Sequence, residues 1–291
     1  MSEEIKKTND KVKGISFLFL GSALLGMSAI FVRYSDSSPS LIAFYRVFLA
    51  LPFVYLWVLM EGKGINLGLL RNKKIFLLLL LSGFCFAVDM SFWNWSITFT
   101  SVANATLMAN TAPVFVVIFG IFFLGVKIKL SFIFTLLLAL IGVFLVVLPG
   151  EESMVFGDSL GIGAAIFYAG YILSIKELTS ALRPAKTLFL VTAVTTLCLL
   201  PISIMEAGHL GISIGELSIL LVYAIFSQTI AQGMITSGIS KVSAHLSSLV
   251  LLMQPVAAAF YGWLLLQEML SPLQIFGGFI VLVAIYLATK K

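Results

Sequence analysis

Long, unbroken runs of apolar residues dominate the chain, and short polar segments separate them. Ten of these runs are about 20 residues long, the length an α-helix needs to cross roughly 30 Å of hydrocarbon. A helix of a soluble protein would instead carry its apolar residues on one face. The pattern predicts an all-α integral membrane protein with ten transmembrane helices, near residues 14–34, 40–60, 74–98, 102–125, 129–149, 157–177, 186–206, 217–238, 243–266 and 271–289.

Composition agrees with this class: 60% of the 291 residues are hydrophobic and only 11% are charged. The formal net charge of +5 raises the question of nucleic acid, but the position of the charges answers it. Sixteen of the eighteen basic residues fall in segments on the same side as the N-terminus, and the opposite loops carry acidic residues only. Basic residues mark the cytoplasmic side. The sequence therefore predicts a multi-pass protein of the cell (inner) membrane with both termini cytoplasmic, and no nucleic-acid partner.

An internal repeat divides the chain into two halves. When the sequence is shifted by 142 residues, "TSVANATLMANTAPVFVVIFGIFFLG" (100–125) aligns with "VSAHLSSLVLLMQPVAAAFYGWLLLQ" (242–267), and Pro113 meets Pro255. Each half holds five spans, an odd number, so the second half must enter the membrane from the opposite side. We expect two inverted five-helix repeats, residues 1–150 and 151–291, an arrangement typical of secondary transporters.

Four segments resemble the EamA-type transporters of the drug/metabolite transporter superfamily. They are "SPSLIAFYRVFLALPF" (38–53), the 100–125 segment, "GDSLGIGAAIFYAGYILSIKEL" (157–178) and "GISKVSAHLSSLVLLMQPVAAAFYGWLLLQE" (238–268), similar to the second, fourth, sixth and ninth helices of that family. The resemblance covers nearly the whole chain and implies a metabolite transporter. One departure stands out: the family often closes its fourth helix with Gly-Glu, where this chain has Gly125-Val126, and the second copy has Gln267-Glu268.

The stretch "FAVDMSFWNW" (86–95) places Asp89 deep in the third span. A charge at the bilayer centre costs roughly 2.5–3.5 kcal/mol and usually faces the bundle interior with a partner. At about 1.5 Å per residue, Asp89 and Arg46 of the second span differ in depth by about 5 Å. One interpretation is therefore an intramembrane ion pair between them. Another is a site for a substrate amine or a proton, with Trp93 as its aromatic wall.

Other polar residues inside the spans extend this site. Asn110, Tyr168, Gln228 and Gln232 lie away from the span ends, so with Asp89 and Trp93 they are candidates for lining one substrate cavity. Membrane amides also commonly hydrogen-bond neighbouring helices, which is the structural alternative. Pro113 and Pro255 fall in the middle of their spans and are expected to kink them, either for packing or to shape the cavity.

These features predict a transporter that moves a small organic metabolite, amino-acid-like or amphipathic, by alternating access; the resemblance implies export. An intramembrane hydrolase is an alternative, because "GDSLG" (157–161) matches G-x-S-x-G around Ser159, but no strand precedes it. The stripe Gly157, Gly161, Ala165 and Ala169 favours helix packing instead. A membrane assembly factor is a third possibility. We expect no enzyme activity, cofactor or metal; membrane lipid surrounds the protein, and a proton or counter-substrate is a candidate for coupling.

Overall fold

The computed structural model describes residues 2–62, 64, 68, 71–148 and 155–290. Within these ranges it contains helices and their connections, with no strand. Ten helical segments are long and apolar enough to span a membrane, which confirms the expected number. They are Thr8–Arg33, Pro39–Met60, Lys73–Phe99, Val102–Leu124, Leu130–Val147, Val155–Ala181, Pro184–Ala207, Ile214–Lys241, Ala244–Leu266 and Pro272–Thr289.

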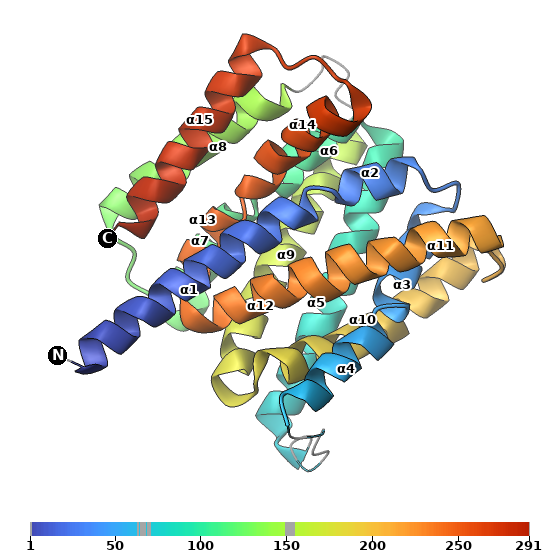
Figure 1. Ribbon diagram of the computed structural model, residues 1–291, viewed down its shortest axis with the longest axis horizontal. Coiled ribbons are helices and arrows are strands. Elements are labelled where there is room, and N and C mark those ends of the chain that lie inside the picture. The colour runs from blue at the N-terminus through green and yellow to red at the C-terminus, as the bar shows by residue number, and fades with distance from the viewer. Residues whose placement is uncertain (1, 63, 65–67, 69–70, 149–154, 291) are drawn as a thin grey trace.

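Five spans are single helices, and five are interrupted (Figure 1). The continuous ones are α5 (Lys73–Phe99), α8 (Leu130–Val147), α9 (Val155–Ala181), α10 (Pro184–Ala207) and α15 (Pro272–Thr289). The interrupted ones are α1 (Ser2–Leu25) with α2 (Ser28–Arg33), α3 (Pro39–Phe48) with α4 (Leu51–Met60), α6 (Val102–Ala109) with α7 (Ala112–Leu124), and α13 (Ala244–Val250) with α14 (Met253–Leu266). In the eighth span a π-helix, Ala224–Ala231, joins α11 (Ile214–Tyr223) to α12 (Gln232–Lys241).

Local sequence sets where these helices begin and end. The Ser271 hydroxyl accepts from the backbone N–H of Gln274, whose side chain accepts in return from the N–H of Ser271, and Pro272 follows as the first helical residue of α15. At the other end of a span, α10 stops at Gly208, whose φ of 72° suits glycine. The sequence thus encodes the span ends as well as their apolar interiors.

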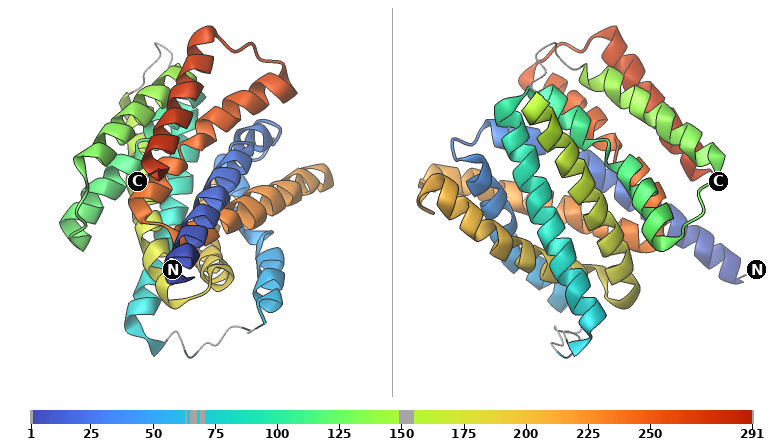
Figure 2. Two further views of the ribbon diagram at one scale, coloured as in Figure 1. Left: turned by 60° about the vertical axis from the view of Figure 1, so that its left-hand side comes forward. Right: turned by 180° about the vertical axis from the view of Figure 1, so that it is seen from behind.

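Helix pairing follows the inverted repeat. The long contact between α5 and α9 joins span 3 to span 6. The contact between α12 and α1 joins span 8 to span 1, which is the same pair with the two halves exchanged. Other pairs couple equivalent spans directly, among them α8 with α15, α7 with α13, and α10 with α3 and α4. Figure 2 shows α8 and α15 side by side at one edge of the bundle. The two halves are therefore interleaved, and each site between them draws on both.

Glycines permit the closest of these contacts. A Cβ on Gly277 would lie 2.7 Å from the carbonyl oxygen of Gly142, and a Cβ on Gly142 would lie 2.9 Å from the oxygen of Gly277. Neither distance is compatible with a side chain, so α8 and α15 approach backbone to backbone, as small residues allow in membranes. The expected small-residue stripe of α9, Gly157, Gly161, Ala165 and Ala169, is likewise buried.

Some sequence predictions fall outside the described residues. The expected division between residues 150 and 151 lies in the undescribed range 149–154, as do Glu151 and Glu152 of the acidic loop. Lys63 and Lys291, two of the basic residues used for orientation, are also outside the described ranges.

Candidate functional site

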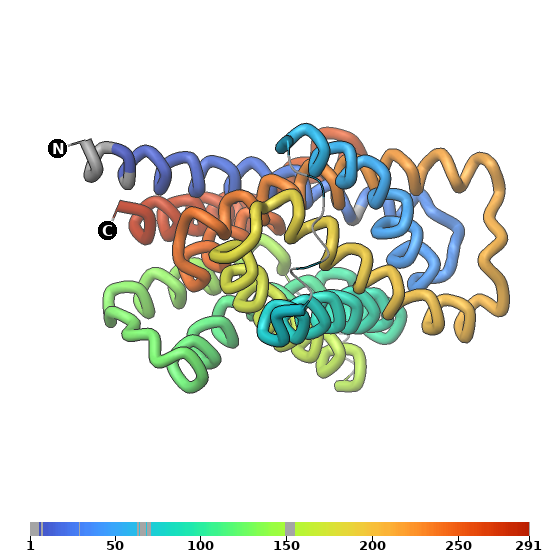
Figure 3. The backbone as a smooth tube through the Cα atoms, turned by 90° about the horizontal axis from the view of Figure 1, so that it is seen from below, coloured from blue at the N-terminus to red at the C-terminus, as the bar shows by residue number. Residues whose placement is uncertain are grey.

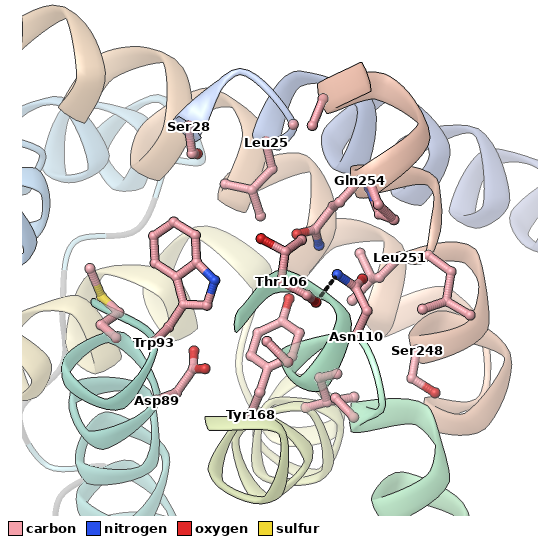
Figure 4. A pocket seen from close by; sticks show the side chains of 18 of the residues that line it. Leu25, Ser28, Asp89, Trp93, Thr106, Asn110, Tyr168, Ser248, Leu251 and Gln254 are labelled. Atoms are coloured by element: carbon pink, nitrogen blue, oxygen red, sulfur yellow. Dashed lines mark hydrogen bonds between the residues drawn. The ribbon is translucent and has the colours of Figure 1, made fainter. Parts of the chain in front are cut away.

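A cavity of about 170 Å³ lies between the two halves, midway along the spans. Asp89 and Trp93 enter it from α5, one turn apart, and face Tyr168 of α9 and Asn110 at the end of α6 (Figure 4). A cavity of about 150 Å³ holds a benzene-sized ligand. In this conformation the space therefore suits a small metabolite.

The breaks in spans 4 and 9 form two facing walls of this cavity. The fourth span is interrupted at Asn110 and Thr111, just before Pro113, and the ninth at Leu251 and Leu252, just before Pro255. The cavity residues on the two walls are related by the same shift of 142 that aligns the repeats: Thr106 with Ser248, Ala109 with Leu251, Asn110 with Leu252, Ala112 with Gln254, and Pro113 with Pro255.

Asp89 lines the cavity without a direct ion pair among the described residues. The ion pairs among the described residues are Arg33–Glu268, Lys74–Glu177 and Lys241–Asp10. The expected Arg46–Asp89 ion pair is therefore corrected to a longer-range interaction: the two side chains line the same cavity and interact electrostatically, without a direct contact between them. Depth along the helix axes placed them at similar levels, but it contained no information on the direction of either side chain.

Aromatic groups hold Arg46 instead. Its Nη1 donates to the Tyr223 hydroxyl at 3.3 Å, and its Cζ lies 5.3 Å from the Tyr223 ring centre and 5.9 Å from that of Phe86. The side chain is 9% exposed, and its Nε has no hydrogen-bond partner in the described structure. A buried guanidinium with an unused N–H is prepared to bind an anionic group.

Tyr168 and Asn110 differ in how far their polar atoms are engaged. The Asn110 amide nitrogen donates to the Thr106 carbonyl at 2.8 Å, so that half of the amide supports the helix end (Figure 4). The Tyr168 hydroxyl faces Gln254 without a hydrogen bond of normal geometry. Its ring stacks on Tyr171 with centroids 5.8 Å apart, which continues an aromatic stack to Phe86.

The two glutamines of span 8 point to different neighbours. Gln232 lines the cavity and donates to the Tyr171 hydroxyl at 2.7 Å. Gln228 is fully buried, does not line the cavity, and donates to Thr192 of α10 at 3.1 Å. The expectation that both face one cavity assumed a continuous α-helix, whereas the π-helix there follows an i→i+5 pattern. Such π-turns are frequent at functional sites.

Sequence reasoning missed Thr106, Ser248 and Gln254 as cavity residues. Their signal was present in the repeat alignment. Thr106 and Ser248 are hydroxyl residues at equivalent positions, and Gln254 immediately precedes Pro255.

The structure offers no support for a hydrolase site at Ser159. Its side chain is exposed, and its hydroxyl donates to the Phe156 carbonyl of its own helix. His245 lies on a different span, in contact with Ser243. No group of three or more His, Cys, Asp or Glu residues within the described ranges is placed to hold a metal ion.

A model of the EamA-like transporter family matches the chain twice, over residues 12–148 and 155–290. The pseudopaline exporter CntI of Pseudomonas aeruginosa is 26% identical over 89% of this chain and 89% of its own length. An uncharacterized transporter of Archaeoglobus fulgidus is 24% identical over 96% of this chain and 97% of its own. A solved crystal structure superimposes with a TM-score of 0.80 over 95% of this chain and 97% of the other, at 15% identity, a level that establishes the fold alone.

Proposed function

The chain belongs to the EamA-like transporter family, and we propose that it exports a small zwitterionic metabolite, resembling an amino acid, by alternating access. The observation that carries the proposal is the presence of one guanidinium and one carboxylate, Arg46 and Asp89, in a single cavity without an ion pair between them. Two opposite charges that face one cavity without direct contact complement a ligand that carries both charges.

Arg46 provides the site for the substrate carboxylate. Its Nε is buried and unused, and an arginine is well suited to bind a carboxylate through two N–H groups. The half-helices α7 and α14 also begin at the cavity, with no side-chain cap on either, although the N–H groups of Val114 and Gln254 already donate to the carbonyls of Thr111 and Leu251. Half-helix N-termini carry a positive partial charge and bind anionic substrate groups in other transporters built from inverted repeats.

Asp89 provides the site for the substrate ammonium group. Its carboxylate is on the same face of α5 as Trp93, one turn away, and both line the cavity. A cation beside a carboxylate and over an indole ring gains both Coulombic and cation–π stabilisation. Apolar residues such as Leu25, Met90 and Ile172 complete the wall and suit a small apolar side chain on the substrate.

The arrangement of the halves supports alternating access. The cavity is built from the interrupted spans 4 and 9, which are equivalent in the repeat and meet at the midplane. Its residues on spans 1, 2 and 3 lie towards the ends remote from the chain termini, as for Ser28, Arg46 and Trp93. In the proposed orientation this is the outer half of the membrane, so the conformation corresponds to a substrate site nearer the outside.

The direction of export is supported by a relative that is an exporter, CntI. We propose residence in the cell (inner) membrane, with repeats at 1–150 and 151–291 and both termini cytoplasmic. Coupling to a proton or a counter-substrate would supply the driving force.

Cysteine labelling tests the orientation. On a background without Cys85 and Cys198, Gly211→Cys in the exposed connection between α10 and α11 should react with a membrane-impermeant thiol reagent in intact cells. Gly64→Cys, exposed at the opposite end of the bundle, should react only after lysis. The physical reason is the strong bias of basic residues towards the end of the bundle that carries Gly64, since basic residues mark the cytoplasmic side. If Gly64→Cys reacts in intact cells and Gly211→Cys does not, the orientation is the opposite of the one proposed.

A metabolite comparison tests the function. Cells that produce the protein should accumulate an amino-acid-like compound in the medium that cells without it retain. Trp93→Ala should weaken this export, because it removes the aromatic wall of the cavity. Trp263→Ala is the matched control, since Trp263 is 49% exposed on α14 and outside the cavity. Equal export by wild type and Trp93→Ala would remove the cavity from the transport path.

A further inference from the structure

A second cavity, of about 530 Å³, opens at the end of the bundle where the chain termini lie. Its walls come from α1, the 125–129 connection, α8, the junction of α12 with α13, and α15. Figure 3 shows the beginning of α1 and the end of α15 at the same edge of the molecule. The cavity thus joins elements of both repeats, and it is separate from the midplane site.

The polar lining of this cavity is basic. Four lysines contribute to it, Lys11, Lys127, Lys129 and Lys241, together with His245. No Asp or Glu is among the lining residues, and the only one of these lysines in an ion pair within the described structure is Lys241, bound to Asp10 at 2.8 Å. Three lysine charges around one concave space strongly favour an anion there.

Hydroxyl groups and a helix N-terminus add to the anion-binding character. Ser131, Thr135 and Ser243 line the cavity beside the lysines, although the Thr135 hydroxyl donates to the Phe132 carbonyl and the Ser243 hydroxyl bonds to His245. Helix α8 begins there at Leu130, and its N-cap residue Lys129 makes no side-chain hydrogen bond to the first turn. Backbone N–H groups at a helix N-terminus are donors to phosphate, and here they lie next to the lysine cluster.

The other side of the cavity is apolar. Phe132, Leu246 and Leu287 line the cavity. The same two helices carry exposed apolar side chains elsewhere, Phe134 on α8 at 65% exposure and Tyr286 on α15 at 59%. A molecule with an anionic head and an apolar tail would find both its environments here.

We propose that this cavity binds a phosphate-bearing anion at the membrane surface, held by Lys11, Lys127 and Lys129. A phospholipid headgroup and a phosphorylated solute offer the same phosphate chemistry, and basic pockets between membrane helices on the cytoplasmic side are known lipid headgroup sites. A ligand there bridges the two repeats, because Lys11 and Lys129 belong to the first repeat and Ser243 and His245 to the second.

The competing explanation is that these lysines serve only to orient the chain in the membrane. A binding cavity and a topology signal differ in one respect: for topology, any basic residue on that side is equivalent. Arg71 and Lys73 are exposed, belong to the segments assigned to the same side of the membrane, and lie outside the cavity. Arg71→Gln with Lys73→Gln therefore removes the same charge as Lys127→Gln with Lys129→Gln and serves as its matched control.

The test measures binding of phosphatidylglycerol to the purified full-length chain in phosphatidylcholine nanodiscs. Each lysine near an anionic surface contributes about 1 kcal/mol, so Lys127→Gln with Lys129→Gln should weaken binding roughly thirty-fold. The control pair should bind within about twofold of wild type. Ser131→Phe, which fills the cavity without changing a charge, should also weaken binding and serves if the double variant does not fold.

Inorganic phosphate as a competitor distinguishes the sources. If phosphate displaces phosphatidylglycerol at comparable concentration, the site recognises the phosphate of a soluble compound; if it does not, the acyl chains are required and the ligand is a lipid. Equal loss in the cavity and control variants, or no loss in either cavity variant, would overturn the proposal.

Discussion

Asp89→Asn is expected to reduce transport at least tenfold while leaving folded protein in the membrane. The substitution keeps the shape of the side chain and removes the charge that the proposed substrate ammonium group would meet. A hydrogen bond to a charged partner contributes about 1.5–3 kcal/mol, equivalent to roughly ten- to a hundred-fold in binding. Stability should not fall, because Asp89 forms no ion pair in the structure and a carboxylate at this depth is itself costly.

Export from cells, or uptake into inverted vesicles, measures the effect once the metabolite comparison has supplied a substrate. Asp158→Asn is the matched control. Asp158 lies in the first turn of α9, accepts a hydrogen bond from the Thr100 hydroxyl, and is outside the cavity. Normal transport by Asp89→Asn at every pH tested would show that the carboxylate is structural. The zwitterion proposal would then have no binding site for the substrate ammonium group.

The ten spans could be predicted from the sequence because the bilayer imposes a length and a composition on each one. The second span, expected near 40–60, runs from Pro39 to Met60, and the last, expected near 271–289, runs from Pro272 to Thr289. In the bilayer, a single apolar segment satisfies its own backbone hydrogen bonds only as a helix. Proline and serine at the helix starts then fix the boundaries to within a few residues.

Side-chain direction was the part that the sequence could not supply. Arg46 was expected to turn towards Asp89, but it turns to Tyr223 on span 8, which is 177 residues away in the chain. Gln228 was expected in the cavity, but a π-helix that no local residue pattern announces directs it to Thr192. Both errors come from treating a span as a uniform α-helix with a known depth and an unknown rotation.

The repeat carried more information than single residues did. Gly125 and Gln267, equivalent after a shift of 142, both end their helices with positive φ, at 63° and 55°. In each half the next backbone N–H bonds back to a glycine carbonyl, Val126 to Gly120 and Glu268 to Gly262. The departure from Gly-Glu in the first half thus preserves the helix end and loses only the acid, which in the second half binds Arg33 at 2.9 Å.

Glu268 in one half and Val126 in the other make the two ends of the bundle chemically different. Lys176 is equivalent to Arg33 after a shift of 143, and with Val126 in place of an acid it donates to the carbonyls of Ile239 and Ser240 instead. Lysine bound to the last carbonyls of a helix is a favourable C-terminal cap. The two ends of an inverted repeat are therefore closed by different chemistry, an exposed ion pair at one and a capped helix end at the other.

Arg46→Gln is expected to lower transport at least tenfold for a substrate with a free carboxylate, because Arg46 supplies the cationic side chain among the residues that line the cavity. The fall should be much smaller for an analogue in which the carboxylate is an ester or amide. Arg33→Gln is the matched control. Arg33 is exposed, and an exposed ion pair such as Arg33–Glu268 contributes about 0–1 kcal/mol, so its loss should leave transport nearly unchanged.

Unfolding in detergent separates this view of Arg46 from the ion pair that the sequence suggested. Breaking a direct buried pair costs about 3–5 kcal/mol, and the two single changes then fail to add. Here the coupling between Arg46→Gln and Asp89→Asn should stay well below about 3 kcal/mol, because Arg46 is held by Tyr223 and Phe86 and acts on Asp89 only electrostatically, across the cavity that both line. A coupling of about 3 kcal/mol would mean that the two charges neutralise each other in the resting protein. The cavity would then hold no free charges for a zwitterion, and Arg46 and Asp89 would be an anchor between spans 2 and 3.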